Sequence, residues 1–224
     1  MSQLSQQRLV AYTGLRKDVV TMIRNQPSRV LDVGCSNGAL LEYLKKERGV
    51  RFTVGIEVDE NLAAEAAGKC DCIVISDLNT FESSSLEYDS FDLIVLADVL
   101  EHTVCPRSVL KEVLKVASEG AQVIISLPNI QHWTAIKNLL VGKWPQRERG
   151  LFDSTHLRFF TYRSLIELAD ACDLRIEVVH RICRIRDAPG GILNRFARFL
   201  NVWPVRAYVT YQYVVSMRRA TQVS

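Results

Sequence analysis

The sequence predicts an α/β protein built around a doubly wound, mostly parallel β-sheet. Short apolar segments alternate with helical patterns between residues 29 and 127, and this alternation is typical of a parallel sheet with helices on both faces. The apolar segments are continuous, as expected for strands that are buried on both sides. The first of them leads into a turn that holds Gly34 and Gly38. A strand, a tight turn and a helix in this order predict a ligand site at the carboxyl edge of the sheet.

The elements of this first part follow one another regularly. We expect strands where a short segment is almost entirely apolar, and helices where apolar residues recur every three or four positions. The expected strands are residues 30–33, 52–58, 72–75, 91–96 and 122–127. The expected helices are residues 16–25, 40–46, 60–67 and 106–117. Pro27, Gly120 and Pro128 mark the ends of the elements that precede them.

The chain changes character after Pro128. Residues 142–155 show no clear period and are expected to form a long loop. The expected helices of this part are residues 130–141, 163–172 and 191–203, the last of them amphipathic. Residues 175–184 and 209–217 are expected to form an antiparallel pair of strands at the end of the chain.

Length and composition favour one globular domain. The 224 residues suffice for one sizeable hydrophobic core. No segment is apolar enough to span a membrane or to act as a signal peptide, so a cytoplasmic protein is expected. We divide the domain into an N-terminal helical segment (1–28), a ligand-binding core (29–127) and a part with helical insertions and antiparallel strands (128–224). The six cysteines form no C-x-x-C pair, which favours buried reduced thiols.

Charge is distributed unevenly along the chain. Residues 1–140 contain 14 Lys and Arg against 18 Asp and Glu, whereas residues 141–224 contain 14 against 7. The net charges of the two parts are therefore −4 and +7, which agree with the overall +3. The basic part is rich in arginine, which favours bidentate contacts with phosphate or carboxylate groups. An anionic substrate or a nearby membrane surface explains this charge, and a solvated arginine-rich face explains it equally well.

The spacing of the glycines in the first turn indicates which ligand is bound. Gly34 and Gly38 are separated by three residues. This spacing does not fit the G-x-G-x-x-G pattern of dinucleotide-binding folds and disfavours an NAD-dependent oxidoreductase. Asp32 ends the preceding strand, and its negative charge suits an ammonium group better than a phosphate. The segment resembles motif I of the class I S-adenosylmethionine (SAM)-dependent methyltransferases, D-x-G-x-G-x-G, with Ser36 in place of the middle glycine.

Three further acids follow strands in an order that matches the parts of SAM. Glu57 lies about 20 residues after the glycine turn, where a carboxylate can accept hydrogen bonds from the ribose hydroxyls. Asp77 is expected to accept a hydrogen bond from the adenine amino group, and Leu78 to contact the ring through its backbone N–H. Asp98 is expected beside the transferred methyl group. The predicted cofactor-binding residues are Asp32, Gly34, Cys35, Gly38, Glu57, Val58, Asp77, Leu78, Ala97 and Asp98.

Two segments carry a narrower resemblance. Residues 96–102 are similar to the v-L-E-H segment of ubiquinone-biosynthesis and small-molecule O-methyltransferases. Residues 153–161 resemble the D-x-T-H-x-R-F-F-T element of methyltransferase type 11/12 and MetW-like proteins. The resemblance implies a Rossmann-like sheet of seven strands with an antiparallel last strand, and a SAM-dependent methyltransferase activity. Such proteins often accompany glycosyltransferases of polysaccharide biosynthesis, which by analogy suggests a glycan- or lipid-linked acceptor.

Two histidines are candidate general bases for methyl transfer to a hydroxyl. His102 follows the fourth strand, and an imidazole titrates near neutral pH. A histidine that caps or packs against the next helix is an equally good interpretation. His156 lies in a polar and aromatic segment of the kind that forms acceptor lids, although a bond to Asp153 that orders the loop is the favoured interpretation. Potential metal ligands such as Glu101 are too scattered to predict a metal site.

Other residues concern the acceptor side. His132 is expected to pack in the interior rather than to line a pocket. Arg147, Arg149 and Arg158 suit an anionic group on the acceptor, and solvated arginines are equally consistent with the sequence. The helix expected at residues 191–203 is interpreted as packing on the sheet or on a second subunit, with contact to a membrane interface as the alternative.

The sequence thus predicts a SAM-dependent O-methyltransferase that acts on a small-molecule or glycan-linked hydroxyl. An N-methyltransferase of nucleic acid or protein is disfavoured, because residues 97–100 lack the [ND]-P-P-[YFW] pattern. No nucleic-acid partner is expected, since the chain has no separate segment for binding one. A non-catalytic SAM-binding protein that regulates a biosynthetic complex, as among MetW-like proteins, is the alternative.

Overall fold

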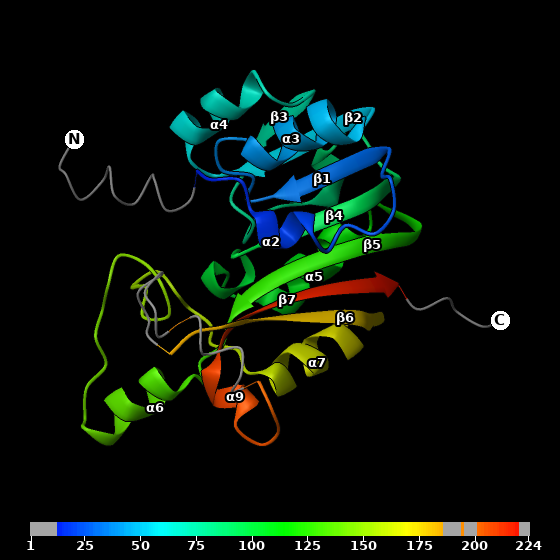
Figure 1. Ribbon diagram of the computed structural model, residues 1–224. Coiled ribbons are helices and arrows are strands. Elements are labelled where there is room, and N and C mark those ends of the chain that lie inside the picture. Colours follow the sequence, from blue (N-terminus) through cyan, green and yellow to red (C-terminus); the bar gives the residue numbers. More distant parts are fainter. Residues whose placement is uncertain (1–12, 186–193, 195–200, 220–224) are drawn as a thin grey trace.

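The computed structural model describes residues 13–185, 194 and 201–219, which form a seven-stranded sheet (Figure 1). The strands lie in the order β3-β2-β1-β4-β5-β7-β6. The first five run parallel, whereas β7 runs antiparallel to both of its neighbours. The strands are β1 (Arg29–Val33), β2 (Phe52–Glu57), β3 (Cys72–Ile75), β4 (Phe91–Ala97), β5 (Ala117–Pro128), β6 (Leu174–Cys183) and β7 (Thr210–Arg219). The predicted fold class, including the antiparallel last strand, is confirmed.

Helices pack on both faces of the sheet because successive residues of the central strands point to opposite sides. In β4, Leu93 and Val95 belong to one hydrophobic cluster, whereas Ile94 and Leu96 belong to the other. Helices on the first face are α2 (Lys17–Val20), α3 (Ala39–Arg48) and α4 (Glu60–Ala67), and those on the second are α5 (Pro106–Leu114) and α7 (Tyr162–Asp170). Shorter or peripheral elements are η1 (Ser83–Ser85), η2 (Leu100–His102), α6 (Trp133–Leu140) and α9 (Arg206–Val209).

Two predicted helices on the first and second faces are longer than the observed ones. The helix expected at residues 16–25 is confined to α2, after which the Met22 carbonyl accepts a hydrogen bond from Nε2 of Gln122 at 2.8 Å. The helix expected at residues 106–117 ends at Leu114, because Ala117 already pairs with Phe91 at the start of β5. Tertiary and sheet hydrogen bonds therefore determine both ends.

The helix expected at residues 130–141 begins later than predicted. It starts at Trp133, where the side chain of His132 accepts a hydrogen bond from the backbone N–H of Thr134 and caps the first turn. His132 is fully buried, and its Nε2 lies 2.8 Å from the carbonyl oxygen of Arg184. The expectation that His132 packs rather than lines a pocket is confirmed.

Some expectations concern residues outside the described ranges. Residues 1–12 of the N-terminal segment and most of the helix expected at residues 191–203 lie there, and with them the alternative of membrane contact. Across the described ranges, no helix has both the length and the apolar character needed to cross a membrane. All six cysteines are free. Cys35 and Cys172 are buried, but Cys105 is exposed, so the expectation of buried thiols is wrong for Cys105.

We expect Gly55→Ala to destabilise the fold, because β2 leaves no room for a side chain at this position. An added Cβ would lie 2.5 Å from Sγ of Cys35 and 2.9 Å from Cδ1 of Ile73. Overpacking of this kind costs about 1–3 kcal/mol in the free energy of unfolding, which urea denaturation measures. Gly68→Ala is the matched control, because nothing lies within 4 Å of its Cβ. Equal losses in the two variants would contradict the packing argument.

Candidate functional site

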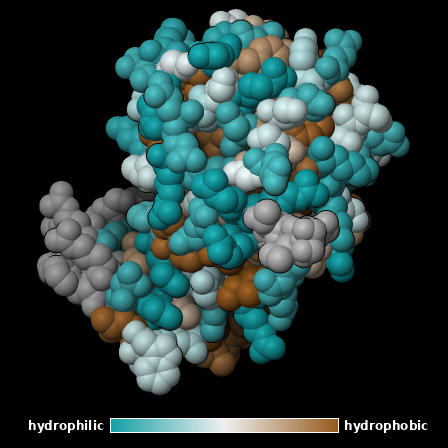
Figure 2. Space-filling model, turned by 90° about the vertical axis from the view of Figure 1, so that its right-hand side faces the viewer, coloured by the Kyte–Doolittle hydropathy of each residue, from teal (hydrophilic) through white to brown (hydrophobic). Residues whose placement is uncertain are grey.

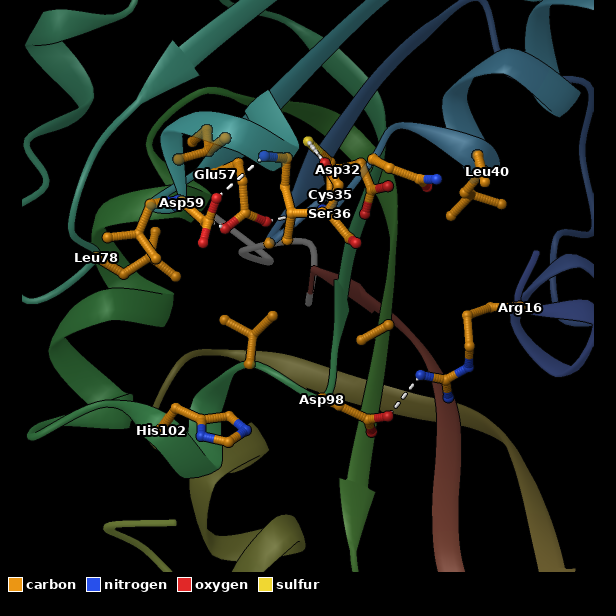
Figure 3. Close-up of a pocket in the computed structure, with 18 of the residues that line it drawn as sticks. Arg16, Asp32, Cys35, Ser36, Leu40, Glu57, Asp59, Leu78, Asp98 and His102 are labelled. Atoms are coloured by element: carbon orange, nitrogen blue, oxygen red, sulfur yellow. Dashed lines mark hydrogen bonds and ion pairs between the residues drawn. The ribbon is translucent and has the colours of Figure 1, made fainter. Parts of the chain in front are cut away.

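A pocket of about 1250 Å³ opens at the carboxyl edge of the parallel strands (Figure 3). Residues that follow β1, β2, β3 and β4 line it, together with residues of the N-terminal segment, β6 and β7. The opposite end of the sheet, where the parallel strands begin, has a mainly hydrophilic surface (Figure 2). All predicted cofactor-binding residues except Gly38 line the pocket.

The turn after β1 requires both of its glycines. Gly34 has a φ of +71°, and an added Cβ would lie 2.5 Å from Cγ2 of Val99. Gly38 has a φ of +75°, and its Cβ would lie 3.0 Å from Ala66. Glycine adopts such angles without steric cost. Ser36, which stands where motif I has glycine, also has a positive φ of 51°. Gly34 thus shapes the pocket, whereas Gly38 lets the start of α3 approach α4.

Two buried carboxylates from neighbouring strands lie on the same side of the pocket (Figure 3). Glu57 accepts hydrogen bonds from the backbone N–H groups of Ser36 and Val58, both at 2.8 Å. Burial, and then the charge of Glu57, raise the pKa of Asp32 to about 7, while Arg16 has an opposing effect. Two buried negative charges in one cavity favour a cationic ligand, because a cation relieves their repulsion.

Cys35 lies beside this carboxylate pair, in the same turn. Its side chain is buried, and its Sγ packs against Gly55. Burial raises the pKa of the thiol, and the charges of Asp32 and Glu57 raise it further. A thiol in this setting stays protonated and unreactive at neutral pH. Cys35 therefore contributes shape rather than chemistry to the pocket.

The end of the pocket near β3 combines apolar surface with a polar edge. Val58 is 63% exposed and Leu78 is partly buried, and both line the cavity. Asp77 is exposed, and its Oδ1 accepts a hydrogen bond from the backbone N–H of Asn79 at 2.9 Å. Oδ1 of Asn79 in turn accepts a hydrogen bond from the backbone N–H of Val104 at 2.7 Å, which ties this loop to the segment after β4. Apolar walls with a few polar groups are typical of small-molecule sites.

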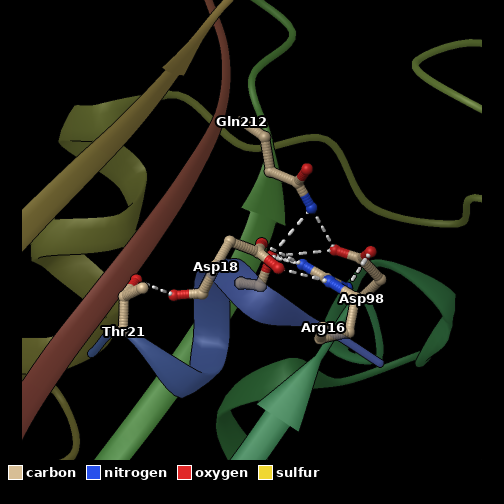
Figure 4. A network of polar contacts seen from close by, with 6 residues as sticks. Arg16, Asp18, Thr21, Asp98 and Gln212 are labelled. Carbon is tan, nitrogen blue, oxygen red and sulfur yellow. Dashed lines mark hydrogen bonds and ion pairs between the residues drawn. The ribbon is translucent and has the colours of Figure 1, made fainter. Parts of the chain in front are cut away.

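Asp98 is the centre of a polar network at the end of β4 (Figure 4). Its backbone has a positive φ of 58°. NH1 of Arg16 donates to its Oδ2 at 2.6 Å, Oγ of Ser126 donates to its Oδ1 at 3.0 Å, and Gln212 donates to the same oxygen. NH2 of Arg16 also donates to Asp18 at 2.8 Å. Although burial alone would lower the pKa of the guanidinium, the two carboxylates raise it.

The network contains two pocket-lining residues that the sequence does not single out. Arg16 and Gln212 both line the pocket, yet they lie 82 and 114 residues from Asp98 in the sequence. Gln212 reaches Asp98 only because β7 pairs antiparallel with β5, opposite Pro128. No local pattern in the sequence signals either contact.

The two candidate bases lie side by side, but only one faces the pocket. His102 lines the cavity from η2, and its Nδ1 lies 3.0 Å from Oγ1 of Thr155. The ring of His156 packs edge-on against that of His102, with 4.8 Å between the ring centroids. His156 is not among the lining residues. Burial, and then the neighbouring His102, lower the pKa of His156. The geometry therefore favours His102 over His156 for contact with a substrate.

A group of potential metal ligands forms around this pair, which the sequence analysis did not foresee. Ligand atoms of Glu101, His102 and His156 lie within 4.8 Å of one another. Oε2 of Glu101 and Nδ1 of His156 are buried, and neither has a hydrogen-bond partner among the described residues. Burial, and then the charge of Asp98, raise the pKa of Glu101. These three side chains are the residues of the described ranges that offer a metal-ligand geometry.

The arginines predicted to bind an anionic acceptor do not act together. Nε and NH2 of Arg158 donate to the Val104 carbonyl oxygen at 2.9 and 2.5 Å, so Arg158 binds the loop to the segment just after η2. The Arg147 guanidinium stacks over the Phe152 ring at 5.5 Å. None of Arg147, Arg149 and Arg158 lines the pocket. Arg184, from the segment after β6, does line it.

Comparison with known proteins gives a family match and several relatives. The model of the family described as "Methionine biosynthesis protein MetW" matches residues 16–195. The ubiquinone biosynthesis O-methyltransferase of Idiomarina loihiensis is 29% identical over 161 residues, which are 65% of this chain and 61% of the relative. The enzyme of the same name from Hahella chejuensis is 34% identical over 105 residues, which are 45% and 43% of the two chains. The chain thus spans less than two thirds of the length of these relatives.

Solved structures with the same fold cover nearly the whole chain. A crystal structure of an S-adenosylmethionine-dependent methyltransferase from Mesorhizobium loti covers 91% of this chain and 96% of its own, with a TM-score of 0.61 and 18% identity. A SAM-dependent methyltransferase from Archaeoglobus fulgidus covers 95% and 94%, with a TM-score of 0.60 and 20% identity. At this level of identity the likeness establishes the fold.

We expect stability to depend on pH through Asp32. Because its folded-state pKa of about 7 lies above its ordinary value, the folded protein holds a proton that the unfolded chain releases between about pH 4 and pH 7. Stability therefore falls as pH rises through this window. Asp32→Asn cannot ionise and should raise Tm at pH 8 by several degrees and at pH 5 by roughly a third as much, since one pKa unit corresponds to about 1.4 kcal/mol and pH 5 lies only about one unit into the window.

Thermal unfolding followed by circular dichroism at the two pH values measures this difference. Asp77→Asn is the control, because it removes an exposed carboxylate of the same pocket. The control should change Tm by the same amount at pH 5 and pH 8. If Asp32→Asn changed Tm equally at pH 5 and pH 8, this result would contradict the raised pKa of Asp32.

Proposed function

Because the chain belongs to the MetW family, we propose that its pocket binds SAM and that the protein is a SAM-dependent methyltransferase. The observation that carries the proposal is the glycine turn together with four carboxylates at the carboxyl ends of adjacent strands, which line one cavity: Asp32, Glu57, Asp77 and Asp98. In this proposal residues 29–127 supply the donor site, residues 128–224 supply the acceptor side, and both belong to one domain. The names of the relatives and of the structural neighbours support the same activity.

The buried carboxylate pair suits the methionine end of SAM. An α-ammonium group beside Asp32 would offset the repulsion from Glu57 that disfavours the charged form of Asp32.

A carboxylate offers about four acceptor sites. Backbone N–H groups of Ser36, Val58 and Asp59 occupy three of those on Glu57. The remaining site is on Oε2, which accepts only from Ser36, so Oε2 is the atom available to a ribose hydroxyl.

The pocket end near β3 suits the adenine ring. Val58 and Leu78 provide apolar surface on which a flat ring can lie, and Asp77 provides an acceptor at its edge. Oδ1 of Asp77 is already engaged with Asn79, so Oδ2 would accept from the adenine amino group. This arrangement agrees with the order of the carboxylates along the sheet.

The methyl acceptor in this proposal is a hydroxyl group of a small molecule. When bound, SAM supplies an activated methyl group on a positively charged sulfur. His102 lies on the opposite side of the pocket from Asp32 and Glu57 (Figure 3), where it can accept the proton of an incoming hydroxyl. A placed base contributes about 10²–10⁴-fold to such a step. Asp98, which is ion-paired with Arg16, lies on the same side of the pocket as His102.

The identity of the acceptor rests on the relatives. Proteins named ubiquinone biosynthesis O-methyltransferase favour a hydroxyl on a small organic molecule. A glycan- or lipid-linked acceptor, an anionic acceptor and a role in polysaccharide biosynthesis stay predictions from sequence, as does a cytoplasmic location. Arg184 is the basic residue of the acceptor side that lines the pocket in the described ranges, and an acceptor with an acidic group would meet it there.

We expect the protein to bind SAM and S-adenosylhomocysteine in isothermal titration calorimetry. Asp32→Asn should weaken SAM binding by roughly 10–100-fold, because a hydrogen bond to a charged group contributes about 1.5–3 kcal/mol. Asp89→Asn, which changes an exposed carboxylate outside the pocket, is the control and should leave the affinity unchanged. Absence of binding of either compound at millimolar concentration would rule out the proposed cofactor.

We expect His102→Ala to abolish most methyl transfer without affecting SAM affinity. With SAM carrying a labelled methyl group and an extract of cellular quinones, lipids and glycans as acceptor, the initial rate should fall about 10²–10⁴-fold. His180→Ala, an exposed histidine of β6, is the control and should retain the rate. SAM binding without any transfer by the wild-type protein would favour the non-catalytic alternative.

A further inference from the structure

Behind the pocket-facing histidine lies a chain of polar groups that reaches a buried carboxylate. Oγ1 of Thr155 lies 3.0 Å from Nδ1 of His102 and 2.6 Å from Oδ1 of Asp153. The backbone N–H of Thr155 donates to the same Asp153 oxygen at 2.9 Å. Asp153 is only 4% exposed. These contacts join the loop after α6 to η2 across 53 residues of sequence.

The direction of these hydrogen bonds is fixed by what each atom can do. An ionised carboxylate only accepts, so the Thr155 hydroxyl donates its hydrogen to Asp153 and presents a lone pair to His102. The Thr155 carbonyl oxygen, 3.2 Å from the same Nδ1, also only accepts. Nδ1 of His102 must therefore carry the hydrogen. In a neutral imidazole, Nε2 is then left with its lone pair.

We propose that Asp153 and Thr155 are positioning residues that hold His102 as the Nδ1–H tautomer, with Nε2 ready to accept a proton. The inference rests on the function proposed above. During transfer, the acceptor oxygen forms a bond to the methyl carbon and its proton passes to Nε2. The bond between that carbon and sulfur breaks, and its electron pair stays on sulfur. The imidazolium then releases its proton to solvent.

The charge of Asp153 contributes to this step through Thr155. When His102 becomes positively charged, a buried carboxylate behind it stabilises the cation. Titratable groups near the ring also include Glu101 on the same turn, His156, whose ring packs against His102, and Asp98 on the same side of the pocket. Within the described residues, the hydrogen-bond contacts of Nδ1 of His102 are with Thr155 and not with any of these three groups. Thr155 is thus the contact that links the imidazole to a negative charge.

The loop that carries Thr155 is held in place independently of its side chain. The backbone N–H groups of Leu157 and Arg158 both donate to the Glu101 carbonyl oxygen, at 2.8 and 2.9 Å. The guanidinium of Arg158 binds the Val104 carbonyl oxygen. Thr155 itself is exposed. A change of its side chain can therefore remove the hydroxyl without releasing the loop.

The tautomer of His102 is the first test, and it needs no methyl transfer. The chain has four histidines, so ¹⁵N NMR with His102→Gln as the assignment variant identifies its ring nitrogens. At a pH where its ring is neutral, we expect His102 of the wild type to be the Nδ1–H tautomer. In Thr155→Val and Asp153→Asn we expect a larger fraction of the Nε2–H tautomer than in the wild type. An Nε2–H tautomer in the wild type overturns the inference, whether or not the protein methylates any acceptor. So does a shift of the Nε2 signal on addition of Mg²⁺ or Zn²⁺, because Nε2 would then be a metal ligand.

Kinetics with a methylated acceptor form the second test. Thr155→Val should lower kcat about 10-fold and Asp153→Asn about 100-fold or more, since a wrong tautomer disables the base. KM for SAM should not change. Thr155→Ser restores the hydroxyl and should recover the rate. Lower rates in Thr155→Val without recovery in Thr155→Ser would indicate a merely structural role and overturn the inference.

Discussion

The ion pair between Arg16 and Asp98 is the contact on which the pocket depends. Asp98 ends β4 with a left-handed backbone, and its carboxylate binds groups from the N-terminal segment, from β5 and from β7. One side chain therefore connects four parts of the chain at the carboxyl edge of the sheet. Loss of Arg16 would leave Asp98 and Asp18 without their counter-charge in a partly buried site, and an unpaired charge costs more than the pair contributes in net stability.

Asp32 differs from Asp98 in its electrostatic surroundings. Asp98 has a guanidinium at 2.6 Å, whereas burial and Glu57 hold the pKa of Asp32 near 7. The free protein thus keeps Asp32 poised between its protonated and ionised forms near neutral pH. A cationic ligand shifts Asp32 to the charged form, and by linkage the ligand binds more tightly as pH rises through that range.

The sequence predicted those features that arise from local patterns. β1 and β4 were visible as apolar runs because both of their faces are buried, and the turn at Gly34 was visible because its positive φ requires glycine. The C-terminal end of α2 was not visible in the sequence, because Gln122 from a distant strand donates a hydrogen bond to the backbone carbonyl of Met22. The partners of Asp98 and His102 were missed for the same reason. Each of these contacts joins residues 28 to 114 positions apart, and no periodicity in the sequence encodes such a pair.

The contrast between local sequence patterns and long-range contacts also separates the two halves of the proposed reaction. The donor half consists of strand ends, whose spacing along the chain is fixed by the βα units and is therefore readable from sequence. The acceptor half depends on how residues 153–158 dock on η2, where one carbonyl oxygen of Glu101 accepts two backbone hydrogen bonds. That docking places Thr155 behind His102, and without it the histidine would have no fixed tautomer. Because a base is useful only with its lone pair aimed at the acceptor, this loop would determine, in the proposed reaction, whether His102 can accept the proton of the acceptor.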